Sequence, residues 1–318
     1  MSDFVRQTAQ PCHFSTSASW VILSPIEQSI KAKIEKIGVP LKNWDISINY
    51  GIKTGFNDAF IINKEKRDEI LSNCVDAAER KRTDELIRPI LRGRDIKKYG
   101  YNWAGLYLIA THNGIPEKGI SRIDIKNYSA IKAHLDSYWQ RINNRSDQGD
   151  TPYNLRSCAY MEDFSKPKIV YPDIMRMPRQ ISALNGYPYF YFDRQNFYIE
   201  ATNFMMTGYN IDIVCSFLAS DLGFYLFSKL FTGPQFDETG FRYKKVYLNE
   251  LPIPEHNENF AAELRTLLPT VSPEEVNATN NVKINKMWCD LIGLTQDESR
   301  IIKQYKTVLL SSCYIDAE

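Results

Sequence analysis

The clearest chemical signal in the sequence lies in a short loop, NYGIKTGFND, at residues 49–58. Gly51 and Gly55 bracket a lysine and a threonine, and Asn57 follows. Glycine allows positive φ and a close approach of the backbone to another surface. Lysine neutralises phosphate, while threonine and asparagine offer short, directional hydrogen bonds. These residue types indicate contact with a nucleic acid; the structural alternative is a hairpin in which Asn57 and Asp58 only satisfy turn backbone.

Basic residues are concentrated just after this loop. The stretch from Arg80 to Lys98 carries eight basic and three acidic residues. Such a block is either a solvated face or a phosphate-binding surface. Within its turn RGRD, residues 92–95, we expect one arginine to pair with Asp95 and the other to point toward phosphate.

Candidates for reading bases lie further along the chain. Arg176 and Arg179 follow the apolar run 166–174, and arginine can make a bidentate contact with guanine. Lys244 and Lys245 lie in a predicted late strand, from which they would contact phosphate. Each of these four residues has the alternative of being merely solvated. The aromatic run GYPYFYF, 186–192, could stack on unpaired bases, although core packing is the more common use of such residues.

Signatures of catalysis are absent from the sequence. It contains no G-x-G-x-x-G, P-loop, G-x-S-x-G or H-E-x-x-H pattern, and its four histidines are far apart. A metal-dependent nuclease would need clustered acidic residues and a lysine, which Asp84 with Asp95-Ile96-Lys97 offers only superficially. We therefore predict no catalytic residue and no metal site, and keep a stand-alone nuclease as an alternative.

Composition indicates a folded protein of the reducing cytoplasm. The 318 residues are 43% hydrophobic, and the six cysteines form no C-x-x-C pair. No apolar run reaches the length of a membrane span, so we expect no membrane contact. The formal net charge of +1 is uneven, because residues 250–318 hold 6 basic and 11 acidic residues.

The pattern of hydrophobic residues predicts an α+β fold, a mixed or antiparallel sheet with flanking helices and a helical C-terminal tail. Ser24 and Pro25 begin a predicted amphipathic helix at 24–37. Further helices are predicted at 64–80, 125–142, 211–230 and 294–302, and strands within 44–62, 104–112, 166–174, 186–199 and 241–254, while residues 86–90 lead to the RGRD turn. We divide the chain into a linker with an amphipathic helix (1–40), a recognition domain (41–255) and an acidic helical segment (256–318).

Several of these stretches, in their order, resemble a known family. ISINYGIKTGFNDAFII (46–62), LIRPILRGRDIKKY (86–99), LYLIATHNG (106–114), KPKIVYPDI (166–174), YPYFYFDRQNFYI (187–199) and GFRYKKVYLNELPIP (240–254) are similar to the TaqI-like C-terminal specificity domain. This is the target recognition region of adenine DNA methyltransferases and of single-chain type II restriction-modification enzymes. The resemblance covers roughly residues 20–255 and is most specific in G-I-x-T-G-x-N-x-A-F and L-R-G-R-D-I.

The resemblance implies a division of labour. A catalytic methyltransferase domain, in cis or in trans, would bind S-adenosylmethionine and hold the flipped adenine with an Asn-Pro-Pro-aromatic motif. This sequence has no Pro-Pro pair and no cofactor-binding glycines, so we expect only the recognition part here, as an excised fragment or a detached subunit.

The predicted partner is double-stranded DNA, and the predicted function is sequence-specific recognition for a restriction-modification methyltransferase. A protein-interaction module on the same scaffold is a further alternative. The residues predicted to contact DNA are Lys53, Thr54, Gly55, Asn57, Arg92, Arg94, Lys97, Lys98, Arg176, Arg179, Arg194, Lys244 and Lys245.

Overall fold

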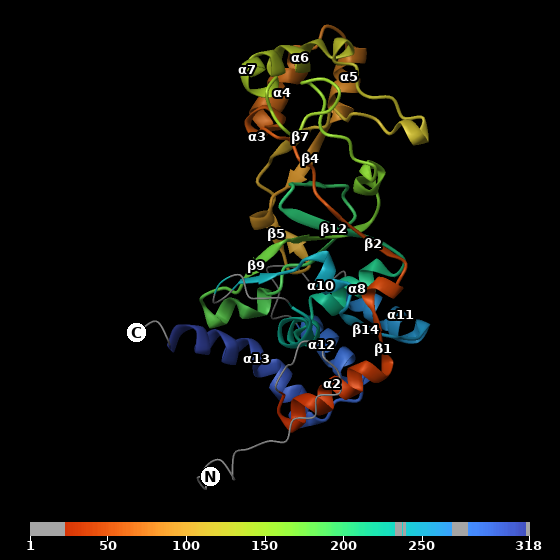
Figure 1. The fold of residues 1–318 in the computed structure, drawn as a ribbon, viewed down its shortest axis with the longest axis vertical. Coiled ribbons are helices and arrows are strands. Elements are labelled where there is room, and N and C mark those ends of the chain that lie inside the picture. Colours follow the sequence, from red (N-terminus) through yellow and green to blue (C-terminus); the bar gives the residue numbers. More distant parts are fainter. Residues whose placement is uncertain (1–22, 233–236, 238–239, 269–278, 316–318) are drawn as a thin grey trace.

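The computed structural model describes residues 23–232, 237, 240–268 and 279–315. Most of the predicted N-terminal linker, residues 1–22, therefore lies outside the described part, as do short pieces of the acidic segment. The molecule is elongated (Figure 1). We call residues 52–91 and 104–165 the upper lobe and residues 24–44, 211–232, 240–268 and 279–315 the lower lobe, after their places in that view.

A four-stranded antiparallel sheet lies between the two lobes. It consists of β2 (Ile46–Tyr50), β8 (Lys168–Pro172), β10 (Tyr191–Asp193) and β12 (Asn203–Gly208), in the order β10-β8-β12-β2. Every residue of β8 is buried. Successive apolar side chains of this strand face two different hydrophobic cores, one on each side of the sheet. Ile169 faces the lower core and Val170 the upper one. Burial on both faces explains why this strand is continuously apolar rather than alternating.

A second sheet consists of three strands of the upper lobe and one strand from residues 198–199. It joins β3 (Ile61–Ile62), β4 (Ile87–Leu91), β7 (Tyr107–Ile109) and β11 (Tyr198–Ile199) in the order β11-β4-β7-β3. β11 and β4 are parallel, and the other pairs are antiparallel. Three short antiparallel pairs complete the strands: β1 (Gly38–Pro40) with β14 (Pro252–Pro254), β5 (Ile96–Lys97) with β6 (Gly100–Tyr101), and β9 (Ile174–Arg176) with β13 (Gly240–Arg242).

The upper helices are shorter than the sequence indicated. They are α3 (Asn57–Phe60), α4 (Lys64–Ser72), α5 (Ala77–Leu86), α6 (Ser129–Asp136) and α7 (Trp139–Ile142). The single helix predicted at 64–80 is wrong, because the chain breaks after Ser72 and Asp76 caps a new helix. The helix predicted at 125–142 is likewise divided, with a 3₁₀ turn at Ile125–Asn127 before α6.

The lower helices include α2 (Pro25–Ile37), α8 (Ile211–Leu218), α9 (Asp221–Leu226), the π-helical turn η7 (Phe227–Phe231), α11 (Glu258–Leu267), α12 (Thr279–Leu291) and α13 (Gln296–Ile315). α2 begins at the predicted residues with a capping box, in which the side chains of Ser24 and Glu27 accept from each other's backbone amides. The helix predicted at 211–230 is two helices bent by 66°. Within the described residues no single helix is long and apolar enough to span a membrane, although this bent pair passes by length and composition.

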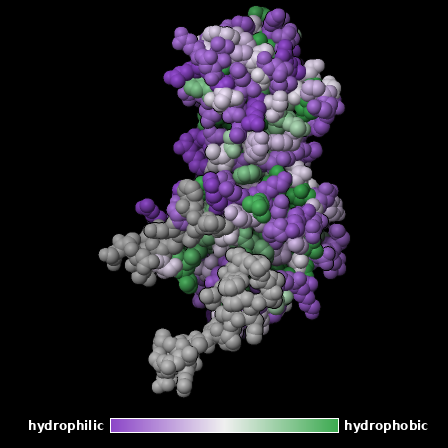
Figure 2. All heavy atoms as spheres, in the orientation of Figure 1, coloured by the Kyte–Doolittle hydropathy of each residue, from purple (hydrophilic) through white to green (hydrophobic). Residues whose placement is uncertain are grey.

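The α+β class is confirmed by these small mixed and antiparallel sheets and the helical C-terminal region. The strand predicted at 241–254 is wrong in its middle, where α10 (Lys245–Leu248) separates β13 from β14. On the face shown in Figure 2 the upper lobe is mostly hydrophilic, with hydrophobic residues scattered among the polar ones.

Candidate nucleic-acid interface

The loop from Gly51 to Asn57 begins where β2 ends and is bonded to β11. The amide of Gly51 donates to the Asn203 carbonyl at 2.9 Å, and that of Ile52 to the Ile199 carbonyl at 2.8 Å. A Cβ atom on Gly51 would overlap the carbonyl oxygens of Ile199 and Glu200. Gly51 is therefore required for close packing on β11 rather than for positive φ, which corrects our expectation for this position. Positive φ occurs at Gly55, at +69°.

Of the three polar side chains of this loop, one faces solvent and two form hydrogen bonds within the protein. Lys53 is exposed, with its Nζ atom 5.7 Å from the centre of the Tyr50 ring. Thr54 is only 3% exposed and donates its hydroxyl to Asn57. Asn57 in turn donates its amide to Glu200 at 2.7 Å. The prediction that Thr54 offers a hydrogen bond to DNA is thus corrected, because its hydroxyl is buried and already used.

A buried arginine, Arg145, contacts this loop on the side that faces the protein interior. It is 6% exposed and donates to the carbonyl oxygens of Thr54, Pro152 and Asn154, with 3.0 Å for the Pro152 contact. Its guanidinium carbon lies 4.3 Å from the centre of the Phe60 ring. Burial lowers the pKa of Arg145 to about 10, against a small opposing effect of Asp147, so it stays charged at neutral pH.

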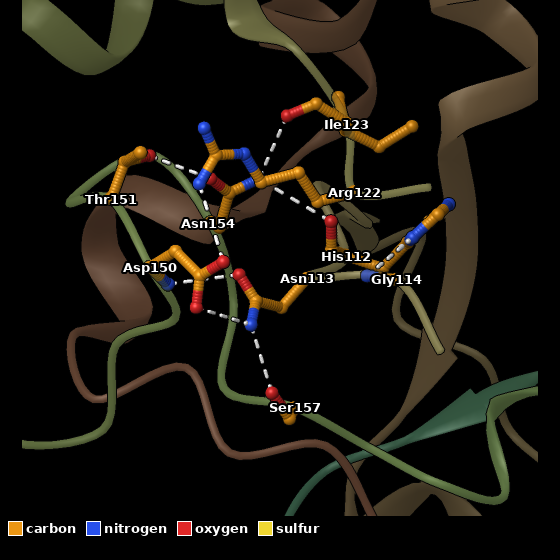
Figure 3. Close-up of polar contacts among 9 residues, drawn as sticks. All are labelled: His112, Asn113, Gly114, Arg122, Ile123, Asp150, Thr151, Asn154 and Ser157. Atoms are coloured by element: carbon orange, nitrogen blue, oxygen red, sulfur yellow. Dashed lines mark hydrogen bonds and ion pairs between the residues drawn. The ribbon is translucent and has the colours of Figure 1, made fainter. Parts of the chain in front are cut away.

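A network of polar side chains extends from Asn154 to the loop that follows β7 (Figure 3). Asn154, 1% exposed, donates to the carbonyl oxygens of His112 and Ile123. Asn113 donates to Asp150 at 3.0 Å and accepts from the Asp150 amide at 2.8 Å. The segments 112–123 and 147–157 are thereby joined into one unit.

The exposed ion pairs of this unit are weakly held. Arg122 pairs with Asp150 at 3.2 Å and Arg156 pairs with Asp147 at 3.0 Å. Both arginines are about half exposed, at 47% and 50%. Exposed pairs of this kind contribute roughly 0–1 kcal/mol, so an anion can displace either aspartate at little cost.

The RGRD turn forms the 3₁₀ helix η2 (Gly93–Asp95). Arg92 makes a bidentate ion pair with Asp95, at 3.0 and 2.9 Å, which raises the pKa of Arg92. Arg94 is exposed, and Lys97 donates to its carbonyl at 2.8 Å. One arginine pairs inward and the other faces solvent, as predicted, whereas contact of either with phosphate stays a prediction.

Lys98 is in the core, which corrects its assignment to the DNA-contacting set. It is 1% exposed, and its Nζ atom makes no hydrogen bond within the described residues. Burial lowers its pKa to about 7, and the nearby Lys306 adds to the effect while Asp221 opposes it. A lysine in this position cannot contact phosphate without leaving the core.

The remaining predicted residues lie on or just after β9, at the start of α10 and at the turn after β10. Arg176 ends β9 and pairs with Asp237 at 2.8 Å, while Arg179 lies exposed beyond it. Lys244 and Lys245 lie at the start of α10 and not in a strand, and Lys245 donates to the Ile48 carbonyl at 3.3 Å.

Arg194 is exposed at the turn between β10 and β11, 4.7 Å from the Phe192 ring centre. The fully buried Lys168 donates to Asp193 at 2.6 Å directly beneath this turn. Asp193 also accepts from the amides of Gln195 and Phe197. The turn that carries Arg194 is therefore fixed from the core.

The basic block between Arg80 and Lys98 is not one surface. Arg80 donates to the Leu71 carbonyl at 2.9 Å and Arg82 to the Asn127 carbonyl at 3.2 Å, so both support helix ends in the upper lobe.

Within the described residues, no three or more His, Cys, Asp or Glu side chains form a group that could hold a metal ion.

The structure brings some of the predicted residues together and leaves others apart. Glu200 accepts from Asn57, and its amide donates to the carbonyl of Leu91, directly before Arg92, at 3.1 Å, so the Gly51–Asn57 loop and the RGRD turn both lie beside Glu200. Sequence reasoning missed Arg145, because it lies in a polar run, NNRSDQGD, typical of a solvated loop. Glu200 was missed because only the pairing of Ile52 with its backbone brings it to the loop.

Comparison with known protein families identifies one family for this chain. The family described as the TaqI-like C-terminal specificity domain matches residues 88–253, just over half of the chain. Comparison with curated proteins finds no match.

Two solved structures share the fold over most of the chain. The type IIG restriction endonuclease BpuSI aligns with a TM-score of 0.53 and 14% identity over 92% of this chain and 33% of its own. The type IIL restriction-modification enzyme MmeI, solved in complex with DNA, aligns with a TM-score of 0.56 and 12% identity over 87% of this chain and 37% of its own. The chain thus spans about a third of the length of these enzymes.

Proposed function

Because the chain belongs to the family of TaqI-like C-terminal specificity domains, we propose that it is a DNA target-recognition module of a restriction-modification enzyme. The observation that carries the proposal is the family match itself, which covers the central strands and the segments bearing Arg94, Arg179 and Arg194. These arginines are exposed, and arginine is the residue most often used to read guanine and to contact phosphate.

The loop that carries Lys53 lies outside the matched residues but belongs to the same surface in our proposal. It is bonded to β11 and to Glu200, which lie inside the match. Lys53 would neutralise phosphate and thereby position the domain, whereas Arg176 and Arg179 would contact base edges. The exposed arginines of the upper lobe, Arg122 and Arg156, would add phosphate contacts by exchanging their aspartate partners.

We further propose that the module serves an adenine-N6 DNA methyltransferase of type II, with or without endonuclease activity. The methyltransferase domain, in the same or another chain, would bind S-adenosylmethionine. A cytoplasmic location belongs to the same proposal. The support for these finer statements is the family resemblance of the sequence, and the structural likenesses support only the fold.

The experiment measures fluorescence anisotropy of a labelled DNA duplex titrated with the chain across a salt series. We expect weak binding whose affinity falls steeply with salt, because each phosphate neutralised contributes about 0.9 to the logarithmic slope. Binding that does not respond to salt, or no binding even at low salt, would contradict the proposal. Magnesium-dependent cleavage of a plasmid by the chain alone would instead support the nuclease alternative.

A further inference from the structure

We propose that Arg145 is a positioning residue for DNA recognition, which holds the Gly51–Asn57 loop so that Lys53 is presented at a fixed place. The inference rests on the proposed function of that loop. Arg145 itself is buried and would not touch DNA.

The loop is fixed at its ends by contacts that do not reach its tip. Gly51 and Ile52 bond to the backbone of the neighbouring strands, and Asn57 bonds to Glu200. Between these points the guanidinium of Arg145 binds the carbonyl oxygen of Thr54, the residue directly after Lys53. The Arg145 side chain also packs against Gly55, where an added Cβ would lie 3.3 Å from the Arg145 Cδ atom.

The other contacts of Arg145 lead to the hydrogen-bonded segments 112–123 and 147–157 of the upper lobe. Its guanidinium binds the carbonyl oxygens of Pro152 and Asn154. The Asn154 side chain then bonds to the backbone of the 112–123 segment, as Figure 3 shows. Arg145 therefore connects the tip of the Lys53 loop to a segment that is itself held on both sides.

The chemistry of Arg145 suits this role better than simple filling of space. Burying a charged group is costly, and an apolar side chain of similar size would fill the same volume without that cost. Only a planar guanidinium presents several fixed donors at once, so it can hold three carbonyl groups in one geometry. The ring of Phe60 provides a further contact for the buried charge.

The test compares Arg145→Met and Arg145→Lys with Arg141→Met, a control that removes an exposed arginine of α7. The first measurement is the rate of trypsin cleavage after Lys53 in the folded protein, which depends on opening of the loop. We expect Arg145→Met to increase this rate at least about tenfold, while cleavage after Lys42, an exposed lysine of the lower lobe, is unchanged.

The second measurement is the salt slope of duplex binding for Lys53→Ala, Arg145→Met and the double variant. If Arg145 acts through Lys53, each single variant reduces the slope by roughly one, and the double variant reduces it no further. A purely structural role of Arg145 would leave the two effects additive. Arg145→Lys, which keeps the charge but has fewer fixed donors, should fall between the wild type and Arg145→Met.

Three outcomes decide the inference. Unchanged cleavage after Lys53 in a folded Arg145→Met protein would overturn it, and so would additive effects on the salt slope. If Arg145→Met does not fold, the same two measurements on Arg145→Lys decide between these outcomes. If the wild type does not bind DNA, the proposed function fails, and the trypsin measurement still shows whether Arg145 fixes the loop.

Discussion

Lys168 donates to Asp193 at 2.6 Å, and neither side chain has any exposed surface. Burial lowers the pKa of Lys168, whereas the charge and hydrogen bond of Asp193 oppose that change. The pair joins β8 to β10 and fixes the turn that presents Arg194. The proposed recognition surface is therefore supported by a charged pair inside the sheet.

Breaking this pair should be strongly destabilising. Asp193→Asn leaves Lys168 buried without its counter-charge, and we expect the free energy of unfolding to fall by about 3–5 kcal/mol in urea denaturation. The matched control is Asp297→Asn, which removes the partner of Arg300 in an exposed ion pair. This control should change the free energy of unfolding by less than about 1 kcal/mol. Similar effects of the two substitutions would contradict our account of the buried pair.

Lys98 should make stability depend on pH above neutrality. Its pKa in the folded protein is about 7, below its ordinary value, so the unfolded chain binds more protons between about pH 7 and 10.5. Stability should therefore rise with pH across this window. Lys98→Met removes this contribution, and the variant should exceed the wild type at pH 7 by on the order of 3 kcal/mol, with the difference disappearing near pH 10.5. A constant difference across the window would show that Lys98 is charged in the core.

Glu298 should make stability depend on pH at the acidic end. Burial opposes its ionisation, but hydrogen bonds from Lys33, Ser29 and Thr295 outweigh that effect and lower its pKa to about 2. The stabilisation is then fully present above about pH 4.5 and is lost as the pH falls toward 2.

The substitution Glu298→Gln tests this dependence. The variant should be less stable than the wild type by roughly 2 kcal/mol at neutral pH, and the difference should shrink toward pH 2. Thermal unfolding followed by circular dichroism between these pH values measures it. A difference in stability between Glu298→Gln and the wild type that grows as the pH falls would contradict our account.

Elements with local signals were predictable from the sequence. The α2 helix follows from its isoleucine spacing and from the capping box of Ser24 and Glu27, which all lie within one segment. The division of 211–230 into α8 and α9 was missed although Ser220 is a good N-cap, because the apolar pattern continues across it. Periodicity reports which face is buried and does not report where the axis bends.

Side-chain environments set by distant segments were not predictable. Lys98 and the half-buried Lys97 are adjacent, yet Lys98 is buried near Asp221 and Lys306, more than a hundred residues away. Arg145 became visible as a support of the Lys53 loop only once Thr54, Pro152 and Asn154 were placed around it. In both cases the sequence shows which type of residue is present, but only the fold shows what its side chain contacts.

The most direct test of the account is selection of bound duplexes from a library with randomised sequence, read by sequencing. We predict that the chain enriches one short sequence. Arg176→Ala or Arg179→Ala should relax the preference at one position, by about 1–3 kcal/mol. Lys53→Ala should weaken binding to all sequences and leave the preference unchanged. No enrichment by a folded wild-type chain that binds DNA would contradict the claim that this protein recognises a specific DNA target.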